Sequence, residues 1–332
     1  MTSSTMPPRR AARRRLLALT GAAVVARAAR AQDAWPARPL RIVQAGAPGG
    51  GSEMMVRAIE PRLAERLHQP LVIESRPGAG GMVAAGLVAT AAPDGYTYFV
   101  SNLATNGIAP SLYRKPSFDP RRDLPGVALI ATMSNAVAVR ADGGLRSVAE
   151  LAAYIKANPK KAFYGSAGAG TSSHLCGVLL GQRAGFEASH VPYKGTAANL
   201  NALLAGEVLF SIDNVPLYAP HVKAGTLRLL AVTRATRIDS FPDVPTLAEA
   251  GVRDFDVSSW YGLSAATGTP PAIIQRLGAE VVAALADPAI QARIRSLGAE
   301  PAPMGPEAYS AFMRSELERW APVVKASGAV LD

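Results

Sequence analysis

The chain has 332 residues, of which 49% are hydrophobic, enough to fill packed cores. A chain of this length usually exceeds what one core serves, so we expect two lobes. Of its 35 Lys and Arg, seven lie at or before Arg30, where no Asp or Glu occurs. The rest of the chain then has 28 basic and 25 acidic residues, so the formal net charge of +10 is no evidence for nucleic-acid binding. Cys176 is the only cysteine, which excludes an intrachain disulfide and a four-cysteine zinc site.

The N-terminal segment has the order of a secretory leader. Five arginines between Arg9 and Arg15 precede an apolar run over residues 16–26, and Ala29-Arg30-Ala31 offers small residues to a signal peptidase. We predict a signal peptide over residues 1–31 and export to the periplasm, where disulfides are optional. The arginines at 13–15 resemble a twin-arginine signal, which leaves the Sec and twin-arginine routes both open. A basic arm that binds nucleic acid is the alternative, but it leaves the apolar run unexplained.

Short apolar strands alternate with amphipathic helices after the leader, which favours an α/β architecture. We predict strands at residues 40–43 and 71–74 and around 96–100. Between the first two, Val56, Ile59, Leu63 and Leu67 recur at helical spacing, and Pro61 should kink that helix. Glycine-rich loops are expected at residues 47–52 and 77–81.

The alternation starts again past about Val139. A helix is predicted at residues 148–157, where Pro159 ends it, and another after Thr171 or Ser172, either of which can cap it. A further helix should run from Thr196 through residue 204. The remaining predicted elements are strands at 162–164, 208–212, 227–232 and 258–264, and helices at 271–285 and 306–327.

Two of the glycine-rich loops, residues 48–52 and 166–172, each follow a predicted strand and open a helix. Glycine lets the backbone turn its N–H groups toward a ligand, and a helix N-terminus adds a partial positive charge. Each loop alone is equally well explained as a tight turn. Because they lie in separate halves of the chain, a cleft between lobes would bring them face to face, and this favours an anion site.

Polar and aromatic residues at two later positions are further candidates. Asp213 and Asn214 follow a predicted strand and could point into a cleft, or could cap the next segment as turn residues. Trp260 and Tyr261 could line a pocket, although a place in a lobe core is the safer expectation.

Motifs of nucleotide binding and hydrolysis are missing from the sequence. It has no G-x-x-x-x-G-K and no G-x-S-x-G, and the glycines at 78–83 and 168–173 lack the third glycine of a dinucleotide fingerprint. The four histidines have no zinc-motif spacing. We therefore predict no catalytic residue, no metal site and no cofactor. A hydrolase that uses Ser166 with His174 or His190 is the enzymatic alternative, and no nucleophile motif supports it.

A series of short segments carries a resemblance to a known family. The first half contains RPLR (38–41), PGG (48–50), ESRPGAGG (74–81), APDGYT (92–97) and PSLY (110–113). The second half contains YGSAG (164–168), HVPYKG (190–195), DN (213–214), AVT (231–233), PDVPT (242–246) and SSW (258–260). In this order, over nearly the whole mature chain, they resemble the solute receptors of tripartite tricarboxylate transporters, also called Bug receptors.

The resemblance implies a two-lobed α/β periplasmic binding protein of the two-crossover (type II) kind. Residues 32–138 and 255–332 would form lobe 1, and residues 139–254 would form lobe 2. Such a protein would be a monomer that captures a small organic carboxylate for membrane permease subunits and binds no nucleic acid. Backbone amides and hydroxyls of two loops would hold the carboxylates. With Asp213, the predicted ligand-binding residues are Ala47, Gly49, Gly50, Gly51, Ser52, Ser166, Ala167, Gly168, Gly170, Thr171 and Ser172.

Three positions depart from the family pattern. Gly46 stands where an aromatic residue is usual, Glu53 replaces an aspartate, and Ala169 replaces an asparagine. Loss of the aromatic side chain should widen or reshape the pocket, as for a bulkier or aromatic acid. A receptor of the same fold that reports its ligand to a signalling partner is the alternative function, and a neighbouring permease gene would favour transport.

Overall fold

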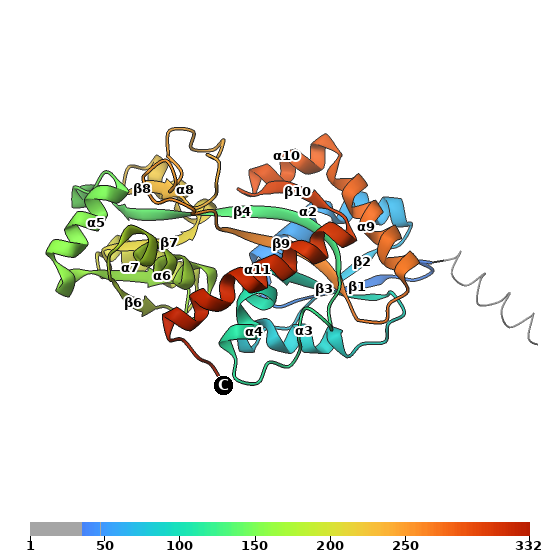
Figure 1. Ribbon diagram of the computed structural model, residues 1–332. Coiled ribbons are helices and arrows are strands. Elements are labelled where there is room, and N and C mark those ends of the chain that lie inside the picture. The colour runs from blue at the N-terminus through green and yellow to red at the C-terminus, as the bar shows by residue number, and fades with distance from the viewer. Residues whose placement is uncertain (1–34, 47) are drawn as a thin grey trace, which may run out of the picture.

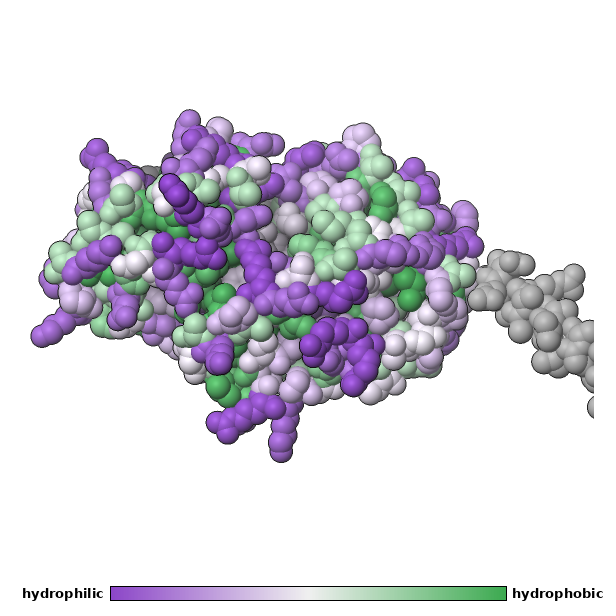
Figure 2. Space-filling view, in the orientation of Figure 1, coloured by the Kyte–Doolittle hydropathy of each residue, from purple (hydrophilic) through white to green (hydrophobic). Residues whose placement is uncertain are grey.

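The computed structural model describes residues 35–332 except residue 47, and Figure 1 shows two α/β lobes side by side. The predicted signal peptide, residues 1–31, and the candidate residue Ala47 lie outside the described residues. Within the described part, no helix has both the length and the apolar character needed to cross a membrane. Figure 2 shows hydrophilic side chains over both lobes, with hydrophobic residues in smaller groups between them.

The first lobe is built on a mixed sheet. Strands β1 (Leu40–Gln44), β2 (Leu71–Ser75) and β3 (Thr97–Asn102) are parallel, and β9 (Ser258–Ala265) runs antiparallel to β3. Strand β10 (Glu300–Met304) is antiparallel to the long strand β4 (Gly126–Arg140).

Helices cover both faces of this sheet because its strands are apolar on both sides. Ile42, Tyr98 and Val100 pack in one core with helices α2 (Gly51–Leu67), α9 (Pro271–Leu285) and α10 (Pro288–Ser296). Val43 and Phe99, one residue along each strand, pack on the opposite face with α3 (Met82–Ala89), as the alternation of strand side chains requires. The same face carries the π-helix η2 (Leu103–Ile108), α4 (Ala109–Leu112) and α11 (Pro306–Ser327).

The second lobe repeats this layering around a smaller sheet. Its strands are β5 (Phe163–Ser166), β6 (Ser189–Pro192), β7 (Phe210–Asn214) and β8 (Leu227–Val232), together with the end of β4. Helices α5 (Val148–Ala157) and α6 (Ser172–Ala184) cover one face. Helices α7 (Thr196–Ala205) and α8 (Val215–Lys223) cover the other.

Strand β4 joins the two lobes. Its residues up to Ser134 pair with β9, and from Asn135 onward they pair with β7 and β8. The return connection lies where the Val257 N–H donates to the Thr233 carbonyl at 2.7 Å. Helix α11 runs from the first lobe across to α6 of the second (Figure 1). Strand β4 thus changes its partner strands between Ser134 and Asn135, a few residues before the predicted lobe boundary between residues 138 and 139. The lobe boundaries themselves stay a prediction.

Most predicted elements are present, one predicted strand begins later than expected, and some elements were not predicted. Helix α2 runs from Gly51 to Leu67 with Pro61 inside it, and the kink at Pro61 stays a prediction. The strand predicted at 208–212 begins later, at Phe210, because the chain turns at residues 206–208. Strands β4, β6 and β10 and helices α3, α8 and α10 were not predicted. Strand β4 is buried on both faces and lacks alternation, and β10 contains two prolines, which are typical of a sheet edge.

Candidate functional site

A cleft of about 160 Å³ lies where the lobes meet, at the starts of helices α2 and α6 and the ends of strands β3 and β7. The first lobe contributes Gly46, Gly51, Ser52, Asn102, Leu103 and Ala104, and the second contributes Ser172 and Asn214. Strand β9 supplies the floor with Ser259, Trp260 and Tyr261. Open α/β sheets commonly bind ligands outside the carboxyl ends of their strands, which is where this cleft lies.

The start of α2 presents backbone donors to the cleft. Gly50 precedes the helix in an extended conformation and provides no side-chain cap. Gly49 has φ +77°, a conformation that favours glycine, and its N–H donates to Glu53 Oε2 at 2.9 Å. The N–H groups of Gly51 and Ser52 lie in the first turn, where no intrahelical acceptor is available. The positive end of the helix dipole therefore faces the cleft.

Tyr261 closes the cleft over Gly51. A Cβ atom placed on Gly51 would lie 2.6 Å from the Tyr261 hydroxyl oxygen, so only glycine fits without displacing the ring. Desolvation by burial raises the pKa of Tyr261 to about 12. The phenol therefore keeps its proton at neutral pH and can donate a hydrogen bond into the cleft.

The second glycine loop is held mainly by its own hydrogen bonds. Thr171 caps α6: its hydroxyl accepts from the His174 N–H at 3.3 Å and donates to the Gly168 carbonyl at 2.7 Å. The Ala167 N–H donates to Ser173 Oγ at 3.0 Å, and the Gly170 N–H donates to His174 Nδ1 at 3.1 Å. Only Ser172 of this loop lines the cleft, and its Oγ lies 3.4 Å from Ser259 Oγ across the lobes.

The predicted ligand-binding residues are thus only partly gathered at the cleft. Gly51, Ser52 and Ser172 line it. Gly49 and Gly50 form the turn ahead of α2, and Ser166, Ala167, Gly168, Gly170 and Thr171 form the loop behind Ser172. For these residues, ligand contact stays a prediction.

Asp213 lies beside the cleft, at the end of β7, with 3% of its surface exposed. Burial raises the pKa of its carboxyl to about 6. The Asn214 N–H at 2.9 Å and Asn199 Nδ2 at 3.2 Å both donate to the carboxyl and oppose that shift. These bonds tie Asp213 to the backbone of Asn214, which does line the cleft.

The sequence predictions missed Asn102 and Ser259 as site residues, whereas Asn214 and Tyr261 were considered for a cleft or pocket without being included among the predicted ligand-binding residues. Asn102 ends β3 and caps η2, with its Oδ1 accepting from the Thr105 N–H at 3.1 Å. Asn214 ends β7 and precedes α8. Both are polar residues at the carboxyl end of a strand, the signal that pointed to Asn214 and that could also have pointed to Asn102. Trp260 is fully buried and was expected in a core, and it also forms part of the cleft floor.

The cleft carries no formal charge among its described residues. None of its lining residues is Lys, Arg, His, Asp or Glu. An anion bound there would be met by N–H groups, hydroxyls and two helix N-termini, which are suited to a carboxylate.

A pair of stacked histidines supports the second loop from behind. The ring centroids of His174 and His190 are 3.8 Å apart, and the angle between the ring planes is 17°. His190 Nε2 is 2.6 Å from Ser166 Oγ, and His174 Nδ1 accepts from Gly170. Desolvation lowers the pKa of His174 to about 4 and that of His190 to about 3. Both rings are therefore neutral near pH 7, as an acceptor role for His174 Nδ1 requires.

This burial predicts that His174 makes folding stability pH-dependent. Its pKa falls from 6.5 in the unfolded chain to about 4 in the folded one, so its contribution is complete above pH 6.5 and is lost as pH falls toward 4. At about 1.4 kcal/mol per pKa unit, the loss is about 3 kcal/mol. The raised pKa of Asp213 acts in the opposite sense below pH 6 and reduces the net slope.

Comparison with His174→Asn isolates the histidine contribution, because the asparagine Oδ1 can still accept from Gly170 and does not titrate. Urea unfolding of both proteins between pH 7.5 and pH 4.5 should show the parent losing more stability on acidification. Parallel pH profiles would show that His174 is not the titrating group.

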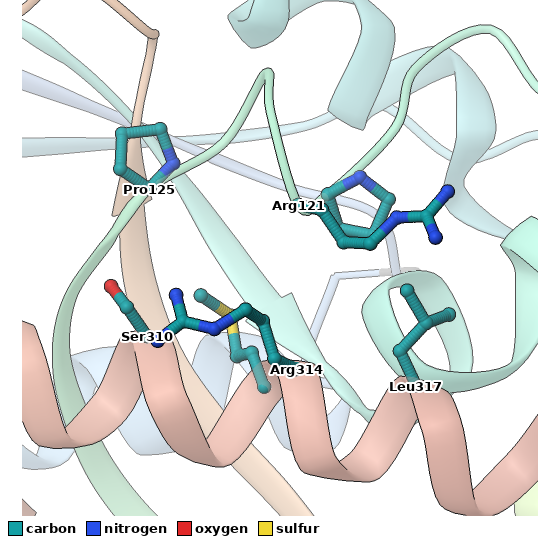
Figure 3. A pocket seen from close by; sticks show the side chains of 7 residues that line it. Arg121, Pro125, Ser310, Arg314 and Leu317 are labelled. Carbon is teal, nitrogen blue, oxygen red and sulfur yellow. The ribbon is translucent and has the colours of Figure 1, made fainter.

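A second, smaller cavity of about 70 Å³ lies against α11, which supplies Ser310, Arg314 and Leu317 to its wall (Figure 3). Arg121 on its rim pairs with Asp119 at 2.8 Å, and Ser310 Oγ accepts from the Gly126 N–H at 3.0 Å. No helix of the described chain begins at this cavity, so it lacks the donors that distinguish the cleft.

Comparison with known proteins shows the family. Residues 55–329 match the family described as "Tripartite tricarboxylate transporter family receptor". Protein BugT of Bordetella pertussis is 33% identical, over 90% of this chain and 92% of its own.

Two solved structures of ligand-bound proteins are similar. The R. palustris protein Rpa4515 with adipate has a TM-score of 0.80 and 36% identity, covering 90% of this chain and 100% of that one. MatC from Rhodopseudomonas palustris with bound malate has a TM-score of 0.75 and 33% identity, covering 87% and 100%. The two-lobed fold is thus that of periplasmic binding proteins of this kind, and the chain belongs to the tripartite tricarboxylate transporter receptor family.

Proposed function

We propose that this protein is a periplasmic solute-binding protein that captures a small carboxylate between its lobes and presents it to the membrane subunits of a tripartite tricarboxylate-type transporter. The observation that carries the proposal is the meeting of two helix N-termini, α2 and α6, at one cleft whose described lining has no charged side chain. The ligands of the two similar structures, adipate and malate, are both dicarboxylates. One carboxylate at each helix start would use both sets of donors.

In this proposal the N–H groups of Gly51 and Ser52 bind one carboxylate, and Ser172 binds the other. Gly49 and Gly50 hold the first loop open, and residues 166–171 hold the second in shape. Tyr261 and Asn102 fix the orientation of the ligand. The only groups required are hydrogen-bond donors, so neither a metal nor a cofactor is needed to bind the acid.

Hydrolysis by Ser166 and His190 is the enzymatic alternative. Their side chains are 2.6 Å apart, but Ser166 is fully buried, and a histidine whose pKa is lowered to about 3 is a weak base. A role in supporting the second loop fits these properties better.

A thermal-shift screen with mono-, di- and aromatic carboxylates tests the proposed function. An acid present at a hundred times its dissociation constant should stabilise the protein by about 2.7 kcal/mol, which raises the unfolding temperature. Neutral diamides of the same chain length are the control and should give no shift. If no carboxylate shifts the unfolding temperature more than its diamide does, the proposed function is wrong.

A further inference from the structure

A buried glutamine ends the first strand, close to the cleft. Gln44 is the last residue of β1 and is 0% exposed. It projects from the same face of β1 as the core residues Leu40 and Ile42, because strand side chains alternate between the two faces. Burying an amide costs free energy unless the amide is hydrogen-bonded, so its partners decide what the glutamine does there.

Both ends of the Gln44 amide have a partner. Its Oε1 accepts from the Gly46 N–H at 2.6 Å, and its Nε2 donates to Ser75 Oγ at 2.5 Å. Because the Gly46 N–H can only donate, the amide atom that faces it must be the oxygen. Ser75 is the last residue of β2 and lies opposite Gln44 in the parallel pair. The Gln44 side chain therefore links the end of β2 to Gly46.

The same amide occupies the space that a side chain at residue 46 would need. Gly46 lines the cleft, whereas Gln44 and Ser75 do not. A Cβ atom placed on Gly46 would lie 2.9 Å from Gln44 Oε1, closer than real Cβ atoms approach an oxygen. The missing side chain thus lets the Gly46 backbone come close enough to bond to the amide. The position of Gly46 in the cleft wall is thereby set by Gln44.

We propose that Gln44 is a positioning residue of the ligand site: it contacts no ligand atom itself and, through its link to Ser75, fixes Gly46 in the cleft wall. A wall that is already in place loses less freedom when a ligand binds, so the link raises affinity. This inference rests on the proposed function and extends the site to two residues that lie outside the cleft.

Gln44→Met tests this role, because methionine fills the buried space without an amide. Gly46 then loses its acceptor, and calorimetry with adipate and with malate as probes should show binding weakened about five- to tenfold, the factor for one neutral hydrogen bond. Tyr98→Phe is the matched control. It removes one buried hydrogen bond, from the Tyr98 hydroxyl to the Gly95 carbonyl at 2.7 Å, near the start of β3 and away from the cleft at its other end. Urea unfolding should show that both variants lose stability, whereas Tyr98→Phe should bind the probes like the parent.

Ser75→Ala tests the same link from its outer end. It removes the acceptor of the Gln44 Nε2 at a residue that does not line the cleft, and affinity should fall about threefold. In the Gln44→Met protein the same substitution should change affinity no further, because both residues act through one chain of hydrogen bonds. If Gln44→Met folds poorly, the affinity of Ser75→Ala alone still decides whether the link affects binding.

The outcomes separate this inference from the proposed function. If the folded Gln44→Met or Ser75→Ala protein loses stability but binds the probes as tightly as the parent, the link only stabilises the end of β1. If Ser75→Ala weakens binding equally in the parent and in Gln44→Met, its effect does not pass through Gln44. Either result refutes the positioning role and leaves a carboxylate receptor. If the parent binds neither probe nor any other acid of the thermal-shift screen, the proposed function fails, and Gln44 has no ligand site to position.

Discussion

Gly51→Ala should abolish ligand binding while leaving the protein folded. The new Cβ would lie 2.6 Å from the Tyr261 hydroxyl oxygen and 3.1 Å from its Cζ, so the ring must move within the cleft. The displaced ring and the methyl group would together keep a carboxylate from the N–H groups at the start of α2. Hydrogen bonds to a charged group contribute about 1.5–3 kcal/mol each, so losing two should weaken binding by a hundredfold or more. The fold should survive, because alanine is favoured over glycine in a helix by about 1 kcal/mol.

Two further variants test the cause. Gly305→Ala adds the same methyl group just before another helix, where nothing lies within 4 Å of the new Cβ, and should bind like the parent. Adding Tyr261→Phe to Gly51→Ala removes the nearest atom and should restore part of the affinity. Titration calorimetry with an acid from the screen measures all of these. Parent-like binding by Gly51→Ala would mean that the ligand does not approach the start of α2.

The sequence predicted much of the fold because most helices and strands here carry local signals. Helix α5 ends at Ala157, two residues before Pro159, and Thr171 does cap α6. Strand β4 is the main omission. Apolar residues fill both of its faces, so it lacks the alternation by which a strand is recognised. Since β4 carries the chain between the lobes, this omission left the crossing point to be inferred from the resemblance and from the restart of the alternation past about Val139.

Site residues at the start of a helix could be predicted from the sequence, whereas site residues on a strand that is distant in sequence could not. Gly51, Ser52 and Ser172 stand at helix starts, which the sequence indicates directly. Ser259 and Tyr261 reach the cleft because β9 inserts between β3 and β4 from far along the chain, and only tertiary pairing places them there. Thr171 shows that a correct local prediction does not establish ligand contact. The sequence indicates a hydroxyl at a helix start, but only the structure shows that this hydroxyl already forms hydrogen bonds within the loop.

The floor of the cleft depends on a buried carboxylate in α11. Glu316 is 5% exposed, and its Oε2 accepts from the indole N–H of Trp260 at 3.1 Å and from that of Trp320 at 3.3 Å. Its Oε1 accepts from Arg319 at 3.1 Å. Trp260 belongs to β9 and lines the cleft, so Glu316 fixes the C-terminal helix to the ligand site.

Glu316→Ala should therefore cause the largest loss of stability among these variants. It leaves two buried indole N–H groups without an acceptor, each costing about 1–3 kcal/mol. Together with the broken ion pair and the cavity that remains, the free energy of unfolding should fall by about 3–5 kcal/mol. Glu316→Gln keeps an oxygen acceptor for the indoles and should lose clearly less. Glu318→Ala, an exposed position on the same helix, should stay within about 0.5 kcal/mol of the parent.

Urea unfolding followed by tryptophan fluorescence measures all three variants, since Trp260 and Trp320 themselves report on the site. A Glu316→Ala protein as stable as Glu318→Ala would show that the indole contacts contribute little. If the prediction holds, ligand affinity should fall in the same order as stability, with Glu316→Ala weakest, because Trp260 can then shift beneath the ligand. If Glu316→Ala loses stability but binds the ligand with unchanged affinity, Glu316 stabilises the packing of α11 without determining the shape of the cleft floor.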